Sequence, residues 1–274
     1  MSELLLGSCD LYLQKFIDEG RKFDLILTDP PYNIGKDFGN DTDSMDLMEF
    51  LQVMKNRLSL LKELLADNGS IVWFCSHRYV GYFQVMLYKM QMTYQRILIW
   101  HYDNGMSRQT RTPISAYEPI LWFSKSDKNW TYNKDDVRVP YKTERVKNPV
   151  YKKDKNGVKK AWMPNPNGAL RTDIFDFPVL AGKLYENERT EHPTQKPESL
   201  ITELLKAFVP KEGGKFVGSV LDPFMGSGTL PVACERLNLN GNSITYTGIE
   251  LEEKWYETAR HRISLMKGSD IHDA

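Results

Sequence analysis

The sequence has few cysteines, no long apolar run and no net charge. Its three cysteines, Cys9, Cys75 and Cys234, are widely spaced, and none belongs to a CxxC pair or a Cys/His cluster. This pattern excludes a disulfide framework and gives no sign of a metal site, so we expect a reducing, cytoplasmic compartment. No basic leader followed by an apolar stretch is found, and no run approaches the roughly eighteen apolar residues of a membrane-spanning helix, so we expect no membrane partner.

Charge is balanced overall but unevenly distributed. The 36 basic and 36 acidic residues cancel. Between Arg138 and Arg171, however, ten Lys and Arg stand against two acidic residues, a local net charge of +8. A basic segment in a neutral protein predicts a local contact with a polyanion, although a solvated surface loop is the usual alternative. Trp162, Asn165 and Asn167, which lie among the lysines, favour contacts with phosphates and base edges.

Short apolar runs alternate with helical patterns, which predicts an α/β fold with a mostly parallel sheet. We expect strands at 23–28, 70–75, 94–100, 119–123, 219–222 and 244–250, and helices at 45–65, 79–90, 198–209, 229–237 and 252–266. A turn at Asp67-Asn68-Gly69 should end the first of these helices. From 124 to 191 the pattern dissolves, which indicates a loop-rich insertion between the halves 1–123 and 192–274 of one domain.

Two glycines, Gly226 and Gly228, lie between an expected strand and an expected helix. Such a turn lets the backbone approach a ligand closely, but a tight strand–helix turn explains it equally well. Glu250, which ends the next strand, is placed to accept hydrogen bonds from a ribose diol. Pro231 occupies the position of the third glycine in the dinucleotide-binding pattern. The loop therefore favours a nucleoside cofactor without phosphates, and S-adenosylmethionine fits.

The sequence Asp29-Pro30-Pro31-Tyr32 follows the strand expected at 23–28. The carboxyl end of a buried strand is where open α/β sheets bind ligands, although a strand-ending turn is the alternative. The Asp29 carboxylate and the Pro30 carbonyl could accept both N–H bonds of an exocyclic amine, which frees its lone pair for direct attack on a methyl group. Tyr32 offers a face on which a base extruded from duplex DNA can stack, worth about 1–3 kcal/mol.

Four motifs in this order resemble the beta group of DNA amino-methyltransferases. They are Asp29-Pro30-Pro31-Tyr32, the basic segment, His192-Pro193-Thr194-Gln195-Lys196-Pro197 and Phe224-Met225-Gly226-Ser227-Gly228-Thr229. Local matches extend the resemblance to the orphan adenine methylase of enterobacteria and to HindIII-type modification methylases. The resemblance covers Leu4 to Met266. It implies the S-adenosylmethionine-dependent methyltransferase (Rossmann-like) fold, a seven-stranded sheet with one antiparallel strand and helices on both faces, plus an inserted recognition region.

Carried over by motif, the resemblance assigns a role to each candidate residue. The catalytic set that holds the target base is Asp29, Pro30, Pro31 and Tyr32. The cofactor set is Asp10, Thr194, Gln195, Lys196, Asp222, Phe224, Gly226, Gly228, Thr229 and Glu250. Asp10 stands two places beyond the acid that the family commonly shows near its N-terminus. The DNA-binding set is Arg138, Lys142, Arg145, Lys159, Lys160, Trp162 and Arg171. The halves 1–123 and 192–274 become the catalytic and cofactor halves, and 124–191 becomes the target-recognition insertion.

The resemblance implies methylation of an adenine N6 amino group in a short site of double-stranded DNA. Cytosine N4 methylation is the nearest alternative, but those enzymes commonly carry Ser where Asp29 stands. An RNA or protein-glutamine methylase would more often show Asn-Pro-Pro-Tyr. A dinucleotide-dependent oxidoreductase is disfavoured by Pro231, and a non-catalytic DNA-binding protein by the intact Asp-Pro-Pro-Tyr sequence. A homodimer and a cognate restriction endonuclease are the partners that the resemblance adds.

Overall fold

The computed structural model describes residues 2–38, 43–104, 111–144 and 148–268. Its centre is a nine-stranded sheet. The strands run in the order β1 (Glu3–Leu6), β11 (Ser243–Glu250), β10 (Lys215–Asp222), β2 (Phe23–Thr28), β3 (Leu65–Phe74), β5 (Tyr117–Ser124), β4 (Thr93–His101) and β8 (Ile174–Asp176), and β9 (Lys211–Glu212) pairs with β10. Strand β5 is antiparallel to both of its neighbours, while the other pairs along the order are parallel. The predicted seven-stranded sheet with one reversed strand is confirmed, with β8 and β9 as short additions.

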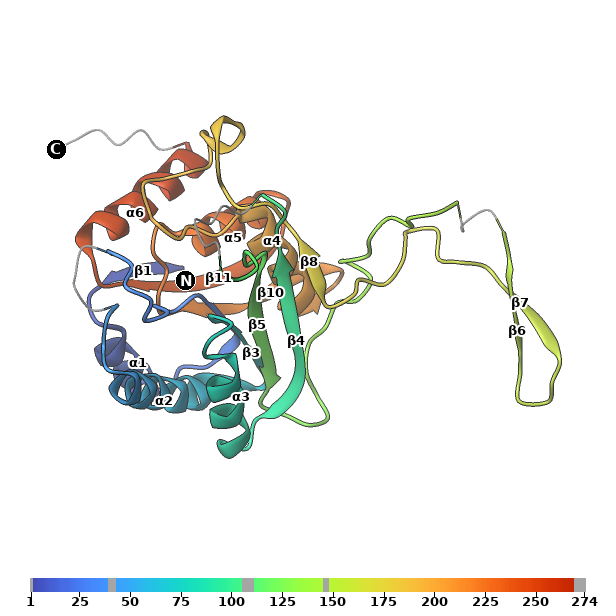
Figure 1. Ribbon diagram of the computed structural model, residues 1–274, viewed down its shortest axis with the longest axis horizontal. Coiled ribbons are helices and arrows are strands. Elements are labelled where there is room, and N and C mark those ends of the chain that lie inside the picture. Colours follow the sequence, from blue (N-terminus) through green and yellow to red (C-terminus); the bar gives the residue numbers. More distant parts are fainter. Residues whose placement is uncertain (1, 39–42, 105–110, 145–147, 269–274) are drawn as a thin grey trace.

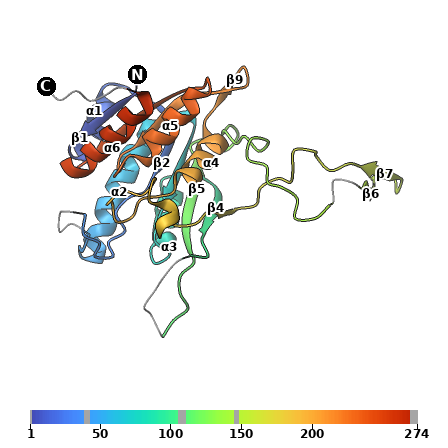
Figure 2. The same ribbon diagram turned by 90° about the horizontal axis from the view of Figure 1, so that it is seen from above.

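Three helices cover each face of the sheet (Figures 1 and 2). Helices α1 (Cys9–Asp18), α2 (Leu47–Leu64) and α3 (Val80–Lys89) cover one face, and α4 (Glu198–Phe208), α5 (Thr229–Leu239) and α6 (Glu253–Lys267) cover the other. Residues along β2 alternate between the two cores: Leu25 and Leu27 pack with α4 and α5, whereas Ile26 packs toward α1 and α2. This alternation follows from the twofold period of a strand and buries its apolar side chains on both faces.

Most elements form where the sequence predicts them, but the boundary between α2 and β3 differs. Helix α2 begins at Leu47 because Asp46 caps it, its side chain accepting hydrogen bonds from the backbone N–H groups of Met48 and Glu49. The predicted turn at 67–69 is wrong. Strand β3 already starts at Leu65, and its register with β2 shifts between Phe23 and Leu25, so the Asp-Asn-Gly sequence forms a bulge within the strand.

The segment 124–191 divides into an anchored part and a projecting part. Its β8 joins the main sheet beside β4, and Val137 and Phe175 are buried in the core. An antiparallel bridge between Val139 and Ala169 then closes the base of a projection, residues 139–169, which we call the arm. The arm extends away from the body and ends in a hairpin of β6 (Val150–Lys153) and β7 (Lys159–Trp162) (Figures 1 and 2).

Neighbouring strands bring chemistry-bearing residues to one edge of the sheet. The parallel strands β1, β11, β10 and β2 are adjacent, so their carboxyl ends lie side by side. Gly7 follows β1, Glu250 ends β11, Asp222 ends β10 and Asp29 follows β2. Because β5 runs in the opposite direction, its first residues lie at the same edge. Among the helices that the structure describes, none has the length and apolarity to cross a membrane.

Candidate active site

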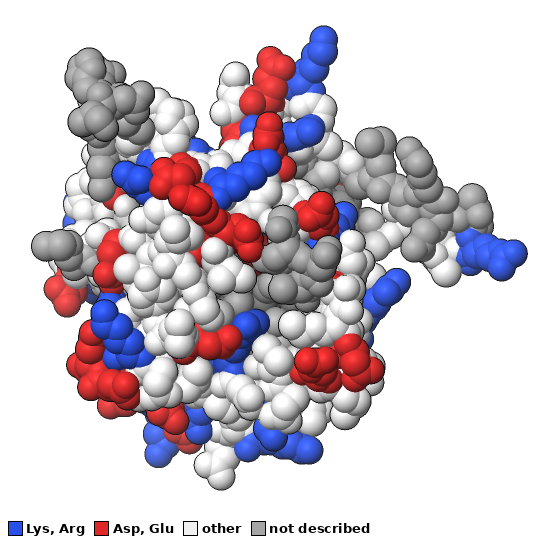
Figure 3. Space-filling model, turned by 90° about the vertical axis from the view of Figure 1, so that its left-hand side faces the viewer, with Lys and Arg blue, Asp and Glu red and all other residues white. Residues whose placement is uncertain are grey.

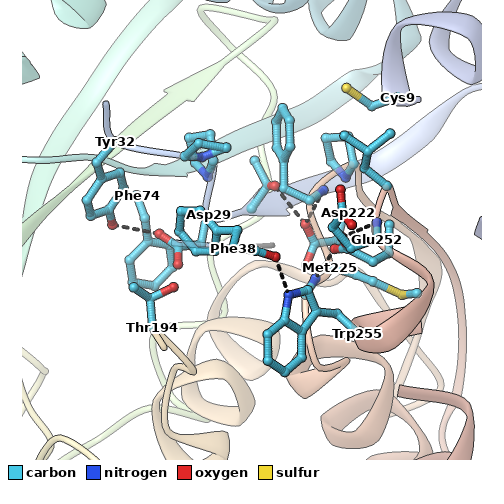
Figure 4. A pocket seen from close by; sticks show the side chains of 18 of the residues that line it. Cys9, Asp29, Tyr32, Phe38, Phe74, Thr194, Asp222, Met225, Glu252 and Trp255 are labelled. Atoms are coloured by element: carbon cyan, nitrogen blue, oxygen red, sulfur yellow. Dashed lines mark hydrogen bonds between the residues drawn. The ribbon is translucent and has the colours of Figure 1, made fainter. Parts of the chain in front are cut away.

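A cavity of about 220 Å³ lies at this edge of the sheet. It is lined by residues that follow β1, β2, β10 and β11, and by the segment before α4. Figure 4 shows Asp29 and Tyr32 at one end of the cavity and Asp222, Met225, Glu252 and Trp255 at the other. The Trp255 indole N–H donates to the carbonyl of Phe38 at 2.9 Å and so fixes a wall of the cavity.

Asp222 is a buried acid at the turn between β10 and α5. Its Oδ1 accepts hydrogen bonds from Thr28 Oγ1 at 2.7 Å and from the backbone N–H of Phe224 at 3.1 Å. Burial raises the pKa of Asp222 from 3.8 to about 7, although these two hydrogen bonds oppose the change. A buried carboxylate without a cation beside it is costly, so this position suits a ligand that carries positive charge.

The glycine loop is shaped by its neighbours. The backbone N–H of Gly226 donates to Glu250 Oε2 at 2.9 Å, which holds the loop against the end of β11. Gly226 and Gly228 have φ of +52° and +78°, which side chains disfavour. A Cβ at Gly226 would come within 2.9 Å of His192 Nε2, and one at Gly228 within 2.6 Å of the Ala259 side chain. Both glycines are therefore required by conformation and by space.

His192 covers the glycine loop as a neutral ring. It packs edge-on against Trp255, with ring centroids 4.8 Å apart, and also contacts Phe38. Burial lowers the pKa of His192 to about 4, and the charges of Lys196 and Arg262 act in the same direction. The ring therefore serves as an uncharged wall near neutral pH.

The Asp29 carboxylate lies in a network of buried polar groups. Tyr32 Oη is 2.6 Å from Asp29 Oδ1, and Lys196 Nζ is 2.5 Å from Asp29 Oδ2. Both donors also approach Glu118 Oε2, at 2.8 Å for Tyr32 and 3.3 Å for Lys196. The Lys196 side chain is only 6% exposed, so its charge is balanced by these two carboxyl groups rather than by water.

A second cavity of about 410 Å³ adjoins the first. Trp100, Glu118 and Val179 line it, and Tyr32, Thr194 and Lys196 form a wall shared by both cavities. Two ligands held in these cavities would meet at this wall, beside Asp29. The arrangement therefore suits transfer of a group from one bound molecule to another.

The structure brings most of the predicted cofactor residues together, with two exceptions. Thr194, Lys196, Asp222, Phe224, Gly226, Thr229 and Glu250 line the 220 Å³ cavity, and Gly228 shapes its loop. Asp10 does not line the cavity, because its carboxylate is held by Arg57 through two hydrogen bonds of 2.9 Å. Gln195 lines the second cavity instead, and its side chain bonds to Thr190 and to the carbonyl of Glu188.

The predicted DNA-binding residues fall into two groups. Lys142, Lys159, Lys160 and Trp162 are exposed on the arm. Arg138 and Arg171 instead lie at its base: Arg138 Nη1 donates to the carbonyl of Gly168 at 2.7 Å, and Arg171 Nη2 pairs with Glu203 at 3.2 Å. Their bonding indicates a structural role at the base of the arm, and a contact of these two with DNA stays a prediction. Arg145 lies outside the described residues.

The charge of the arm contrasts with that of the opposite face. Eight Lys and Arg stand against two acidic residues between 139 and 169, a net charge of +6. On the face turned away from the arm, acidic and basic side chains are intermixed (Figure 3). Net positive charge is therefore concentrated on the arm, in contrast to the mixed charges of this face.

Sequence reasoning missed Glu118 and Arg57. Glu118 is two residues into β5, and only the reversed direction of that strand brings it to Asp29. Arg57 lies on α2, lines the first cavity and places its guanidinium 5.5 Å from the ring centroid of Phe224. A Glu directly before an expected strand was the available signal for Glu118, whereas the helical position of Arg57 gave none.

Known DNA methylases resemble this chain in sequence. A sequence model of the DNA methylase family designated N6/N4 matches residues 23–261. The type II methyltransferase M.HpaI of Haemophilus parainfluenzae is 31% identical over 275 residues, which cover all of this chain and 78% of that protein. The DNA adenine methyltransferase YhdJ of Escherichia coli K12 is 28% identical, over 88% of this chain and 76% of YhdJ.

Solved structures of DNA methyltransferases share the fold. The M1.HpyAVI–SAM complex superposes with a TM-score of 0.65 at 25% identity and covers 96% of this chain and 99% of that one. The cytosine-N4-specific PvuII DNA methyltransferase superposes with a TM-score of 0.67, over 100% of this chain and 88% of that one. At 13% identity, the second likeness shows the fold alone.

Proposed function

Since the chain belongs to the N6/N4 family of DNA methylases, we propose that it transfers the methyl group of S-adenosylmethionine to the N6 amino group of an adenine in DNA. The observation that carries this proposal is the position of Asp29, which lines the first cavity and bonds to Tyr32 and Lys196 in the wall shared with the second. Its neighbour Pro30 also lines the first cavity and adds a rigid carbonyl.

The 220 Å³ cavity fits S-adenosylmethionine by its chemistry. When bound, this molecule supplies an electrophilic methyl group on a positively charged sulfur. Asp222 offers a buried carboxylate for its ammonium group, and Glu250 offers one for its ribose hydroxyls. Gly226 and Gly228 let the loop adopt its left-handed backbone, because a Cβ there would press against His192 or Ala259. The absence of a third glycine agrees with a ligand that carries no phosphate.

The second cavity is the proposed pocket for the target base. Its aromatic walls, Tyr32 and Trp100, suit a planar ring, and its 410 Å³ can hold a purine. A base in a duplex cannot reach Asp29, so we propose that it is flipped out of the helix. Asp29 and the Pro30 carbonyl then accept the N–H bonds of the amine and orient its lone pair toward the first cavity.

Adenine is favoured over cytosine by the acid at position 29. In the family that the motifs resemble, the N4 enzymes commonly carry Ser there, whereas this chain has Asp29. The relative YhdJ is named as an adenine methyltransferase, and PvuII methyltransferase as cytosine-N4-specific, so both chemistries occur on this fold. Cytosine N4 is therefore the second candidate.

The arm is the proposed DNA contact within the recognition insertion 124–191. In its hairpin, Lys152 lies opposite Lys160 and Lys153 opposite Lys159. Like charges directly across a strand pair destabilise it, and a two-stranded ribbon has little stability to spare. A DNA backbone relieves this repulsion, and the major groove admits a two-stranded ribbon. The exposed Trp162 adds a surface for apolar contact.

The test is to sequence methylated plasmid DNA from cells that lack other methylases and express this chain. We expect N6-methyladenine at one short site, and its loss in Asp29→Ala, which should still bind S-adenosylmethionine in calorimetry. Asp18→Ala, at an exposed position on α1, is the matched control and should methylate normally. N4-methylcytosine would overturn the choice of adenine, and substantial activity in Asp29→Ala would overturn the mechanism.

A further inference from the structure

Two carboxyl groups in the proposed active site share the same two donors. Tyr32 Oη lies 2.6 Å from Asp29 Oδ1 and 2.8 Å from Glu118 Oε2. Lys196 Nζ lies 2.5 Å from Asp29 Oδ2 and 3.3 Å from Glu118 Oε2. The four side chains therefore form a closed ring, in which each carboxyl group contacts both the phenol and the ammonium group.

The number of hydrogen atoms available for hydrogen bonds within this cycle of four side chains is limited. A phenol has one hydrogen, so Tyr32 can donate to only one of its two carboxyl neighbours. If both acids were ionised, the other short contact would place oxygen lone pairs against each other. One carboxyl proton removes the conflict, because a protonated acid donates to Tyr32 Oη while the phenol donates to the ionised acid.

The charge balance of the four side chains also favours one carboxyl proton. With two ionised acids the ring has a net charge of −1, and with one carboxyl proton it is neutral. Lys196 is almost fully buried, and the side chains of Asp29 and Glu118 are 22% and 24% exposed. Burial raises the pKa of Asp29, and the charge of Lys196 opposes this change while that of Glu118 adds to it.

The position of Lys196 decides which acid is ionised. Its ammonium group is 2.5 Å from Asp29 but 3.3 Å from Glu118, so it stabilises negative charge on Asp29 more strongly. We propose that Glu118 carries the shared proton and acts as a positioning residue that keeps Asp29 ionised and correctly oriented. The inference rests on the proposed function, because an ionised Asp29 is the form that accepts an N–H bond from the target amine.

Other titratable groups that face the ring do not replace Glu118 in this role. Burial raises the pKa of Tyr102 and of Cys75 above their ordinary values, and His192 is neutral with a pKa of about 4. Asp222, with a pKa of about 7, titrates in the relevant range. A test must therefore show whether a carboxyl proton is carried by an aspartic acid or by a glutamic acid.

Infrared spectroscopy with isotope labels makes this distinction. At neutral pH we expect the carbonyl band of a protonated carboxylic acid that shifts when glutamate carries carboxyl ¹³C and that disappears in Glu118→Gln. Glu212→Gln, at an exposed position on β9, is the matched control and should keep the band. The proposal is overturned if the band shifts only when aspartate is labelled. It is also overturned if Glu118→Gln leaves the glutamate band in place, or if wild type shows no glutamate band. This readout needs no methyl transfer, so it decides the inference even if the chain proves inactive on DNA.

Single-turnover methylation supplies the functional readout. We expect Glu118→Gln to retain most of the wild-type rate at neutral pH, because its amide can still donate to Tyr32. Glu118→Ala should lose about 10- to 100-fold in rate, with unchanged affinity for S-adenosylmethionine, because Tyr32 and Asp29 lose their alignment. Loss of the shared proton should reduce the wild-type rate at alkaline pH, and Glu118→Gln should lack this decrease. Superimposable pH profiles of wild type and Glu118→Gln would overturn the proposal.

Discussion

Asp222→Asn tests whether the acidic end of the first cavity is built for a cationic ligand. Folding raises the pKa of Asp222 from 3.8 to about 7, chiefly through burial. The folded state therefore holds this proton more tightly than the unfolded state does. The contribution of Asp222 to the free energy of unfolding should fall as the pH rises from 3.8 to about 7, and this contribution should be constant above that range. A difference of about three pKa units corresponds to about 4 kcal/mol.

The asparagine variant removes this pH dependence. Its amide oxygen can still accept hydrogen bonds from Thr28 Oγ1 and the Phe224 N–H, but it carries no charge that must be buried. We expect the variant to be more stable than wild type by up to about 4 kcal/mol at about pH 8, with the gain disappearing toward about pH 4. Its affinity for S-adenosylmethionine should fall by about 10- to 100-fold, because a charge-assisted hydrogen bond to the ammonium group is lost.

Urea unfolding at several pH values and titration calorimetry measure the two effects. Asp67→Asn is the matched control, because the Asp67 side chain is fully exposed and its neutralisation should leave both quantities nearly unchanged. If Asp222→Asn were less stable than wild type at alkaline pH, the burial argument would be wrong. If its cofactor affinity were unchanged, Asp222 would not contact the cationic group.

Three further predictions concern the arm and the glycine loop. Lys159→Glu combined with Lys160→Glu should weaken DNA binding and reduce its salt dependence; an unchanged salt slope in fluorescence anisotropy would exclude these lysines as phosphate contacts. Arg171→Ala should cost about 1–3 kcal/mol in urea unfolding, because Glu203 and the Val137 carbonyl lose a donor, yet leave the salt slope as in wild type. Gly228→Ala should lower both stability and cofactor affinity, since its Cβ would press against Ala259, and a variant with wild-type values in both assays would contradict this.

The sequence predicted the sheet and its site where the signals are local. The apolar alternation of Phe23 to Thr28 and the glycines at 226 and 228 lie within a few residues of the features they predict. The apolar runs and the residues that interrupt them also predict where β2, β10 and β11 end. Parallel pairing then places these strand ends side by side, so the core of the site could be assembled before the structure was known.

Features that depend on distant pairing were not predictable in this way. Strand β8 has three residues, and it forms because β4, about 75 positions earlier, offers an open edge. Glu118 reaches Asp29 only through the reversal of β5, which no local pattern encodes. Arg171 and Arg138 appeared as part of a basic run, but their hydrogen bonds to the base of the arm can be seen only in three dimensions.

The way in which the arm joins the body has an evolutionary consequence. The chain leaves and re-enters the body at adjacent points, Val139 and Ala169, which are tied by a single bridge. Under the proposed function, substitutions, insertions or a complete exchange between these two residues would alter the DNA contact without changing the sheet or the two cavities. Hybrid enzymes with arms transplanted between relatives would be the laboratory equivalent, and selection could diversify target sites through the same exchange.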